Sequence, residues 1–320
     1  MDATKGSKTR LSIIIPILNE ETLLPELYSR LKQVLNSLSI AHEIIFVDDG
    51  SEDSSYPFLQ SLAEKDSDVK VLRLSRNFGH QVAITAGMDY SQGEAVVIMD
   101  GDLQDPPELI PTLLEKWNEG FEVVYAIRKK RKGEKLFKLF TAYFFYRIIR
   151  KITKIQIPSD TGDFRLMSRK AMNELLKMRE RHRLIRGMVS WVGYKQTGVE
   201  YERDERFAGK TKFSWFKMAQ FALDGITSFS NVPLKMATYL GFLVSFLSLI
   251  KIIELSVNYF YKSYVPGWAS IMVAVLFLGG VQLITIGIIG EYIGRIHEEV
   301  KNRPLYLVDE EINFKKNLVP

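Results

Sequence analysis

The sequence predicts an α/β fold, in which helices cover a mostly parallel sheet, followed by two long apolar helices near the C-terminus. Two observations support this prediction. Short runs of apolar and β-branched residues alternate with helical stretches over residues 11–126, which is the pattern of repeated strand–helix–strand units. Long segments without charge then follow Pro233. The chain of 320 residues is long enough for one large domain with an appendage.

Five short apolar runs are predicted as strands, and a helical stretch separates each from the next. The strands cover residues 11–18, 42–47, 69–74, 95–99 and 122–126, and the helices between them cover 19–38, 54–64, 81–90 and 107–117. Because such units give parallel strands, their carboxyl ends meet at one edge of the sheet, where ligands bind. Polar residues follow the first four strands directly, so we expect a binding site at that edge.

Two helices in the middle of the chain combine basic residues with a wide apolar face. They cover residues 135–155 and 213–229. Such helices are typical of the membrane surface, where the apolar face enters the bilayer and the cations meet the headgroups. The alternative interpretation is that both are ordinary core helices of the domain.

Two apolar segments near the C-terminus predict a transmembrane hairpin. Residues 236–250 carry no charge, and residues 268–289 form a second uncharged run that is long enough to cross about 30 Å of hydrocarbon. Tyr and Trp residues lie near the turn between them, and Lys/Arg-rich segments flank the pair, so the positive-inside rule places both termini in the cytoplasm. We expect a multi-pass protein of the inner (plasma) membrane with a cytoplasmic catalytic domain. A buried hairpin in a soluble domain is the alternative.

The composition limits the classes of function. The chain has no cysteine, which excludes disulfides and thiolate metal sites. The net charge of +5 favours anionic partners, but the basic residues accompany the segments expected at the membrane, so a nucleic-acid partner is not expected. The predicted parts are residues 1–134 and 135–231 of the catalytic domain, the hairpin 232–296 and a cytoplasmic tail 297–320.

Asp100, Gly101 and Asp102 directly follow the fourth predicted strand. Two carboxylates two residues apart on a turn can both reach one hard cation, and Mg²⁺ commonly joins such carboxylates to substrate phosphates. Gly101 lets the backbone approach closely, and Gln104 can add a neutral oxygen. The alternative is a pair of aspartates that only caps the following helix.

Other polar groups stand at the ends of the first three strands. Asp49 follows the second strand and can accept hydrogen bonds from a base or a ribose, although an ordinary capped turn is the alternative. Residues 15–20 form a loop where a base could rest. Arg76, Gly79 and the helix start after the third strand could hold a diphosphate. For His80 we favour a structural or sugar-contacting role.

These segments together resemble one family. The matching pieces are IPILNEE, VDDGSEDSS, RNFGHQVAITAGMDYSQGEAVVIMDGDLQDPPE, GDFRLMSRKA, ERFAGKTKFS and GEYIGRIHEEVKNRPLYLV. They span nearly the whole chain. The sequence resembles family 2 glycosyltransferases with a GT-A fold, and within them the polyisoprenyl-phosphate glycosyltransferases, such as bactoprenol glucosyl transferases and dolichyl-phosphate mannose synthases.

The resemblance implies an inverting enzyme that moves a sugar from a nucleotide diphosphate-sugar to a polyisoprenyl phosphate lipid with a divalent metal, Mg²⁺ or Mn²⁺. It implies that Asp100, Asp102 and Gln104 hold the metal. It also implies that Pro16, Leu18, Glu20 and Asp49 hold the nucleotide. The predicted nucleotide-sugar site further includes Arg76, His80, Asp100 and Gly101. Arg206, followed by a Gly-x-Thr-Lys element that contains Lys210, is expected to contact the donor diphosphate.

On the acceptor side, the resemblance implies that Arg128 contacts the lipid phosphate, together with Lys135 or Lys138. A phosphate monoester has a second pKa of about 6 and is largely ionised at neutral pH, so a strong base is less necessary. Asp163 is the first candidate for a base or an orienting carboxylate, and Asp160 is the second. A loop cap is the alternative for Asp163.

The sequence leaves the sugar donor, the class of function and the oligomeric state open. Glucose from UDP-glucose is favoured, but GDP-mannose, UDP-GlcNAc or UDP-aminoarabinose would fit the same chemistry. A processive polysaccharide synthase is disfavoured because the chain has no Q-x-x-R-W motif, and a non-catalytic membrane scaffold that binds nucleotides is the alternative from another class. A glycine-bearing face on the second apolar helix could support a homo-oligomer; its members are Gly279, Gly280, Gly287, Gly290 and Gly294.

Overall fold

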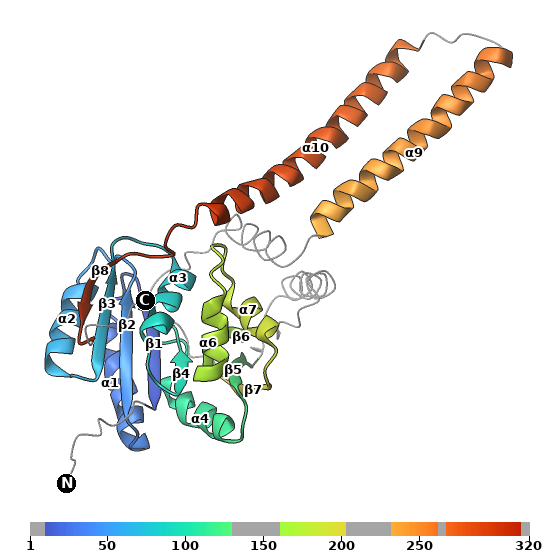
Figure 1. Ribbon diagram of the computed structural model, residues 1–320. Helices are drawn as coiled ribbons and strands as arrows, with labels where there is room; N and C mark the ends of the chain where they lie inside the picture. Colours follow the sequence, from blue (N-terminus) through green and yellow to red (C-terminus); the bar gives the residue numbers. More distant parts are fainter. Residues whose placement is uncertain (1–9, 130–160, 203–231, 262–266, 315–320) are drawn as a thin grey trace. The chain divides into compact units, whose positions relative to one another are not determined.

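The computed structural model describes residues 10–129, 161–202, 232–261 and 267–314 (Figure 1). These residues belong to two compact units, a sheet domain that also includes residues 303–314 and a helical unit that contains residues 232–302. The expected helices 135–155 and 213–229 lie outside the described residues.

The sheet domain contains eight strands. They are β1 (Leu11–Ile17), β2 (His42–Asp48), β3 (Val69–Leu74), β4 (Ala95–Ile98), β5 (Val123–Arg128), β6 (Thr161–Ser168), β7 (Gln196–Tyr201) and β8 (Val308–Ile312). The helices of this domain are α1 (Leu24–Leu38), α2 (Ser55–Lys65), α3 (His80–Tyr90), the 3₁₀ turn η1 (Pro107–Leu109), α4 (Ile110–Asn118), α6 (Arg169–Lys177) and α7 (Ile185–Val192).

The eight strands form one mixed sheet in the order β7-β5-β6-β4-β1-β2-β3-β8. The four central strands β3, β2, β1 and β4 are parallel, which confirms the predicted α/β sheet. Antiparallel pairing occurs on both sides of this core, because β6 runs against both β4 and β5, and β8 runs against β3. The antiparallel direction of β6 matters for the site, since its first residues lie beside the carboxyl end of β4.

The five strands expected from residues 11–126 are all present, but the first helix starts later than expected. The predicted helix starts at Asn19, whereas α1 begins at Leu24 with Pro25 in its first turn. Proline fits the first helical turn, where its missing N–H costs nothing. Asn19 itself has a φ of 56°, which is outside the helical region. The residues between β1 and α1 are therefore a loop at the binding edge.

Alternating side chains of β1 pack against different helices. Ile13 and Ile15 lie in the hydrophobic core together with Leu27 of α1. Ile14 faces α3, where a Cβ on Gly87 would lie 2.4 Å from its Cγ2 atom. Only a glycine permits this close approach, which brings α3 against the sheet.

The C-terminal segment, for which the sequence analysis predicted only a tail, forms the edge strand β8. Tyr56 and Tyr90 each donate a side-chain hydrogen bond to a glutamate of this strand, and the bond from Tyr90 to Glu311 measures 2.7 Å. Asn313 donates to the carbonyl oxygens of Ala63 and Val69, both at 2.8 Å. The segment therefore covers the edge of β3, which would otherwise expose unpaired backbone groups.

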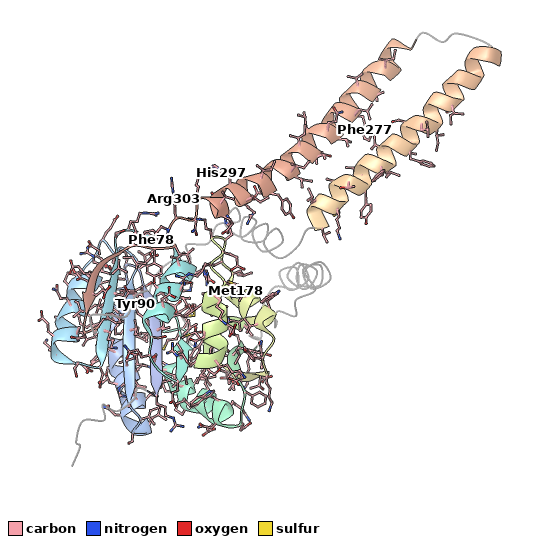
Figure 2. The ribbon with its side chains drawn as sticks, in the orientation of Figure 1. Phe78, Tyr90, Met178, Phe277, His297 and Arg303 are labelled. Atoms are coloured by element: carbon pink, nitrogen blue, oxygen red, sulfur yellow. The ribbon has the colours of Figure 1, made fainter. Side chains whose placement is uncertain are left out.

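The helical unit contains α9 (Val232–Tyr261) and α10 (Trp268–Val300), which pack side by side as an antiparallel pair (Figure 1). Many large apolar side chains on both helices are exposed, including Phe242 and Phe277, and the latter is labelled in Figure 2. Among the described residues, the helix 273–300 is long and apolar enough to cross a membrane, and Leu234–Ile250 is a shorter apolar helix. At Gly279 and Gly287 an added Cβ would meet no atom of the described residues within 4 Å, apart from the nearby backbone of its own helix. The oligomer predicted from this glycine face stays a prediction.

Candidate active site

The loops after β1 and β2 are fastened to each other. The side-chain oxygen of Asn19 accepts a hydrogen bond from the backbone N–H of Glu52 at 2.8 Å, and its own N–H donates to the hydroxyl of Ser51 at 3.0 Å. The N–H of Glu20 donates to the hydroxyl of Ser55 at 2.9 Å. These bonds hold the first loop in one conformation. Of the predicted nucleotide-binding residues, Leu18 and Glu20 lie on this loop and are half-buried, and Pro16 is a buried residue near the end of β1.

Asp49 connects this edge to the loop after β3. Its two carboxylate oxygens accept hydrogen bonds from the backbone N–H groups of Phe78, at 2.7 Å, and Gly79, at 2.9 Å. Burial raises the pKa of Asp49, although these two bonds oppose the change. The neighbouring Gly50 has a φ of 76°, and a Cβ there would lie 2.8 Å from the backbone of Arg76. Asp49 therefore fixes the loop that carries Arg76, and its predicted contact with a nucleotide stays a prediction.

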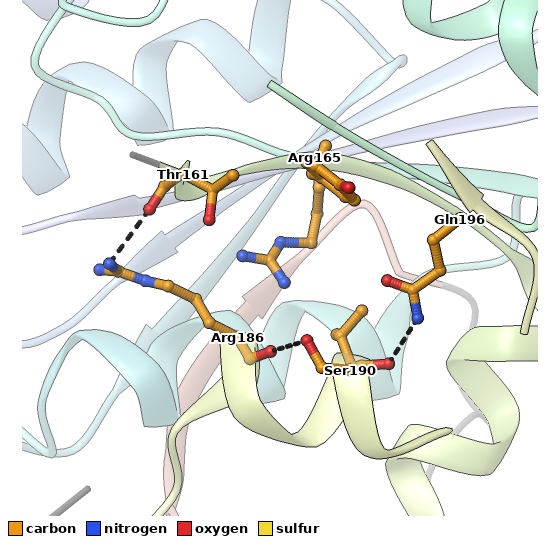
Figure 3. Close-up of a pocket in the computed structure, with 7 residues that line it drawn as sticks. Thr161, Arg165, Arg186, Ser190 and Gln196 are labelled. Atoms are coloured by element: carbon orange, nitrogen blue, oxygen red, sulfur yellow. Dashed lines mark hydrogen bonds between the residues drawn. The ribbon is translucent and has the colours of Figure 1, made fainter. Parts of the chain in front are cut away.

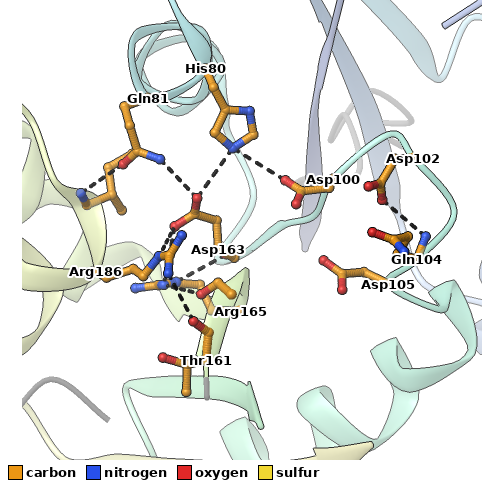
Figure 4. Close-up of polar contacts among 12 residues, drawn as sticks. His80, Gln81, Asp100, Asp102, Gln104, Asp105, Thr161, Asp163, Arg165 and Arg186 are labelled. Carbon is orange, nitrogen blue, oxygen red and sulfur yellow. Dashed lines mark hydrogen bonds and ion pairs between the residues drawn. The ribbon is translucent and has the colours of Figure 1, made fainter. Parts of the chain in front are cut away.

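Arg76 and His80 lie on or directly after this loop. The guanidinium of Arg76 lies 4.0 Å from the ring centre of Phe78, and its Nη1 donates to the carbonyl oxygen of Asn77. His80 is the first residue of α3 and projects between two carboxylates (Figure 4). Its Nε2 lies 3.4 Å from Oδ1 of Asp100 and 3.3 Å from Oδ2 of Asp163. His80 thus joins the end of β4 to the start of β6.

The turn after β4 carries the predicted metal ligands. Gly101 packs against the end of β1, where a Cβ would lie 2.7 Å from Cδ1 of Ile17. One carboxylate oxygen of Asp102 accepts a hydrogen bond from the N–H of Gln104 at 3.1 Å. Oδ1 of Asp100 is buried and forms no hydrogen bond in the described structure, although Nε2 of His80 lies 3.4 Å from it. Burial raises the pKa of Asp100, and the negative charges of Asp105, Asp163 and Asp102 raise it further against the opposing charge of His80.

A divalent cation fits the chemistry of this turn. Asp100 and Asp102 offer the carboxylate oxygens that Mg²⁺ and Mn²⁺ accept, and the excess of negative charge around Asp100 is what a bound cation would neutralise. Within the described residues, no group of three or more acidic or histidine side chains is already gathered around one point. The amide of Gln104 is the neutral donor expected to join the two carboxylates.

Asp163 lies at the centre of a polar network near the start of β6 (Figure 4). Arg186 of α7 donates from Nε to Oδ1 at 3.1 Å, and Arg165 lies 3.7 Å from the same oxygen. Gln81 of α3 donates to Oδ2 at 2.9 Å, beside the contact from His80. The side chain of Asp163 is 5% exposed. Residues of three elements therefore hold one carboxylate in place.

These partners decide the electrostatics of Asp163. Burial alone would raise its pKa, but the hydrogen bond with His80 and the charges of Arg186 and Arg165 outweigh burial and hold the pKa well below its usual range. Burial alone would also lower the pKa of His80, yet Asp163 and Asp100 raise it. A carboxylate with so low a pKa is a weak base, so the arrangement suits orientation of His80 better than proton removal. Asp160, the second candidate, lies outside the described residues.

A small cavity lies beside this network and is lined by Arg165 and Arg186 (Figure 3). Nη1 of Arg186 donates to the carbonyl oxygen of Thr161 at 3.2 Å, and the hydroxyl of Ser190 donates to the carbonyl oxygen of Arg186 at 3.1 Å. Gln196 of β7 donates to the carbonyl oxygen of Val189 at 3.0 Å. The bonds to Thr161 of β6 and from Gln196 of β7 hold α7 against the sheet, so that Arg186 stays directed at Asp163.

Arg128, the predicted acceptor-phosphate residue, is the last residue of β5. Its Nε donates to the hydroxyl of Tyr201 at 3.2 Å, and its Nη2 lies 3.9 Å from Oδ1 of Asp105. Its side chain is 29% exposed. Lys135 and Lys138 lie outside the described residues, as do the predicted donor-diphosphate residues Arg206 and Lys210.

Three residues of the site are not predicted from the sequence, namely Gln81, Arg186 and Tyr201. Gln81 directly follows His80, and Arg186 stands in a basic run next to apolar residues. No motif in the sequence marks Gln81 or Arg186 as a site residue, because their roles depend on the direction of β6 and the packing of α7.

Comparison with known proteins decides the family. Residues 12–176 match Glycosyl transferase family 2, and residues 232–296 match the GtrB C-terminal hairpin. The chain belongs to glycosyl transferase family 2. It is therefore a glycosyltransferase, and its mixed sheet with flanking helices is the GT-A-like fold that the resemblance implied.

Relatives within this family align with nearly the whole chain. The uncharacterized glycosyltransferase YkcC of Bacillus subtilis is 52% identical over 300 residues, which are 93% of each chain. The SfII prophage-derived bactoprenol glucosyl transferase of Shigella flexneri is 43% identical over 303 residues, which cover 93% of this chain and 97% of that protein. These alignments extend through both the sheet domain and the apolar helices.

Solved structures show more distant similarity. Mannosyl-3-phosphoglycerate synthase from Rubrobacter xylanophilus matches with a TM-score of 0.48 and 15% identity, over 68% of this chain and 72% of that one. Glucosyl-3-phosphoglycerate synthase from Mycobacterium tuberculosis, in complex with Mn²⁺, uridine diphosphate and phosphoglyceric acid, matches with a TM-score of 0.46 and 15% identity, over 67% and 75% of the two chains.

Proposed function

We propose that the protein transfers a hexose from a nucleotide diphosphate-sugar to a polyisoprenyl phosphate at the cytoplasmic face of the membrane, with glucose from UDP-glucose and undecaprenyl phosphate as the first pair to test. The observation that carries the proposal is the 43% identity to a bactoprenol glucosyl transferase over 303 residues, which cover 93% of this chain. Bactoprenol is the lipid in that protein's name, and its phosphate would be the acceptor here.

On the donor side, Pro16 near the end of β1 and Leu18 and Glu20 on the loop after it would hold the nucleotide together with Asp49. Arg76 and His80 would face the diphosphate and the sugar. Asp100, Asp102 and Gln104 would hold a divalent cation. When bound, this cation would supply positive charge against the diphosphate that leaves. Arg206 and Lys210 would add cationic contacts to the same diphosphate. The excess negative charge around Asp100 supports the cation site.

On the acceptor side, Arg128 and one of Lys135 and Lys138 would bind the lipid phosphate. A phosphate oxygen is already ionised at neutral pH and can attack the anomeric carbon without a strong base. It would attack from the face opposite the nucleoside diphosphate, so the configuration at that carbon inverts. Asp163 would act by holding His80 in place, as its low pKa supports.

The acceptor also explains the apolar helices. A polyisoprenyl tail stays in the bilayer, so the domain that uses its phosphate must be held at the surface. We propose that α9 and α10 form a two-helix membrane anchor with both termini in the cytoplasm, as the positive-inside pattern favours. The match of residues 232–296 to the GtrB C-terminal hairpin supports this anchor. So do the exposed apolar side chains, because water-exposed patches of this extent are rare in soluble proteins.

Transfer of radiolabelled sugar to lipid tests the proposal. The purified full-length protein is incubated with UDP-glucose and undecaprenyl phosphate, with Mg²⁺ or with EDTA, beside the variant Asp102→Ala. The expected result is label in the lipid phase that requires metal and is lost in the variant. Label from a different nucleotide sugar alone would replace glucose as the donor. No label from any donor, with the protein folded, would overturn transfer and favour a nucleotide-binding scaffold.

A further inference from the structure

The acceptor arginine ends its strand beside a tyrosine that ends the neighbouring strand. Arg128 and Tyr201 are the last residues of β5 and β7, and the parallel pairing of these strands places them opposite each other. The hydroxyl of Tyr201 accepts a hydrogen bond from Nε of Arg128 at 3.2 Å and donates one to Oδ1 of Asp105 at 2.5 Å. Tyr201 therefore connects the partly exposed guanidinium of Arg128 to the buried carboxylate of Asp105.

The ring of Tyr201 is held firmly enough to act as a support. It is 5% exposed and packs edge-on against Phe164, with ring centres 6.1 Å apart and planes at 85°. Close to the other end of the guanidinium group, a Cβ on Gly162 would lie 2.5 Å from Nη2 of Arg128. The guanidinium therefore contacts Tyr201 through Nε and lies close to Gly162 through Nη2, and these two neighbours limit the directions in which it can meet a ligand.

The groups around Arg128 leave its guanidinium charged and able to bind an anion. Asp105 is fully buried, and its oxygen is 3.9 Å from Nη2 of Arg128, which is too far for the paired hydrogen bonds that an arginine forms with a carboxylate in direct contact. Burial alone would lower the pKa of Arg128, but the bond with Tyr201 and the charge of Asp105 raise it. The guanidinium thus stays charged and partly exposed, while the tyrosine holds one of its N–H groups.

We infer that Tyr201, supported by Asp105, positions Arg128 to receive the phosphate of the acceptor lipid. This inference rests on the proposed function only in assigning the lipid phosphate to Arg128. Asp105 directly follows Gln104 of the predicted metal-binding turn, so the same contact ties the acceptor side of the site to the donor side. Tyr201 is a positioning residue, because it acts through Arg128.

Direct binding of a lipid phosphate tests this role without any sugar transfer. The full-length protein in detergent is titrated with geranylgeranyl phosphate and, separately, with geranylgeraniol, which lacks the phosphate. Tyr201→Phe removes only the hydroxyl and is expected to weaken phosphate binding about tenfold, the usual size of one charge-assisted hydrogen bond. Binding of the alcohol is expected to stay unchanged. If the variant also transfers sugar, KM for the lipid rises while KM for the nucleotide sugar does not.

Tyr90→Phe is the matched control. Tyr90 is also buried, and its hydroxyl donates to a carboxylate, Glu311, at the opposite edge of the sheet. It loses the same kind of bond and is expected to bind geranylgeranyl phosphate like the wild type. A second comparison adds Tyr201→Phe to Arg128→Ala, where no further loss is expected because the tyrosine has nothing left to position.

The outcomes separate this inference from the proposed function. If phosphate binding depends on Tyr201 but the protein transfers no sugar to the lipid, the inference is supported and the proposed sugar transfer is refuted. Equal phosphate binding by Tyr201→Phe and the wild type would overturn the inference, as would a loss that affects the alcohol equally or that adds to the loss from Arg128→Ala.

Discussion

Asp100 and Asp163 lie on the two sides of His80, yet the protein treats them in opposite ways. Asp163 near the start of β6 is almost completely enclosed, with Gln81 and two arginines around it, and its pKa is far below normal. Asp100 at the end of β4 has a quarter of its side chain exposed, and one buried oxygen forms no hydrogen bond in the described structure. Its pKa is raised.

The difference shows that surroundings, and not residue type, divide the work between carboxylates. A carboxylate that is already satisfied by the protein stabilises the fold and orients its neighbours. A carboxylate surrounded by other negative charges gains most from an added cation. The base role considered for Asp163 in the sequence analysis is therefore the weaker interpretation, and the cation role of Asp100 is the stronger one. Four substitutions can break or sharpen this contrast.

The largest effect is expected from Asp163→Asn. Arg165 and Arg186 would then face a neutral amide in a buried setting, and the loss of one partner of a buried ion pair costs about 3–5 kcal/mol of unfolding free energy. Urea denaturation measures it. The matched control is Asp309→Asn, since Asp309 also lies near an arginine, Arg73 at 3.8 Å, but is 53% exposed. The control is expected to cost about 0.5 kcal/mol or less. Equal losses in the two variants would refute the contrast.

Asp100→Asn is expected to act in the other direction. Without metal, it removes one charge from a repelling cluster, so the free energy of unfolding stays constant or rises. With Mg²⁺ at about 100 times its Kd, the wild type gains about 2.7 kcal/mol from binding, and the variant does not. Thermal unfolding with and without Mg²⁺ measures both effects. A variant that keeps the full Mg²⁺ response would place the cation elsewhere.

The position of Asp100 could be predicted from the sequence, but the surroundings of Asp163 could not. Asp49 and Asp100 follow strands of a parallel sheet, and in such a sheet the strand order alone brings their loops to one edge. The five strands and the positions of these loops could therefore be read from the pattern of apolar runs. The role of Asp49 in fastening the loop at Phe78 could not, since a hydrogen bond to a backbone N–H leaves no mark in the sequence.

The surroundings of Asp163 depend on contacts that no local pattern encodes. β6 runs antiparallel to β4 and pairs Arg165 with Ile98, and only this direction places Asp163 beside His80. Arg186 arrives from α7, more than twenty positions further along the chain. The strand β8 escaped prediction for the same reason, because its acidic sequence gains stability only from partners such as Tyr90. Amphipathic periodicity indicates which face of a helix or strand is buried, but it does not indicate which residues distant in sequence that face contacts.

Gln81 is the residue that tests these distant contacts. Its side chain donates to Asp163 at 2.9 Å and accepts from the backbone N–H of Ile185 at 2.9 Å, so it joins α3, β6 and the first turn of α7. Gln81→Leu is expected to cost about 1–3 kcal/mol of unfolding free energy, because it leaves two partly buried groups without this partner. Gln196→Leu, which removes one hydrogen bond to Val189, is the graded comparison and should cost less. A smaller loss from Gln81→Leu than from Gln196→Leu would show that the network around Asp163 is not tightly held.

The smallest effect is expected where a carboxylate has an arginine partner but little burial. Glu108 of η1 accepts two hydrogen bonds from Arg30, at 2.9 and 2.7 Å, and these bonds lower its pKa, yet its side chain is 52% exposed. Since the folded pKa lies below the ordinary value of 4.5, the pair contributes stability above that pH and loses it as the pH falls through the folded value. Glu108→Gln is expected to cost only about 0.2–1 kcal/mol at neutral pH, because water screens exposed pairs.

Urea denaturation at neutral pH and in acid, with and without added salt, measures how much unfolding free energy Glu108→Gln removes. The loss from Glu108→Gln should shrink as salt is added and vanish in acid, where the wild-type glutamate is itself protonated. The loss from Asp163→Asn should resist salt, because Asp163 and Arg165 are almost fully buried and ions reach them poorly. A loss from Glu108→Gln that equals the loss from Asp163→Asn would mean that the arginine partner, and not its burial, decides what a carboxylate contributes to this fold.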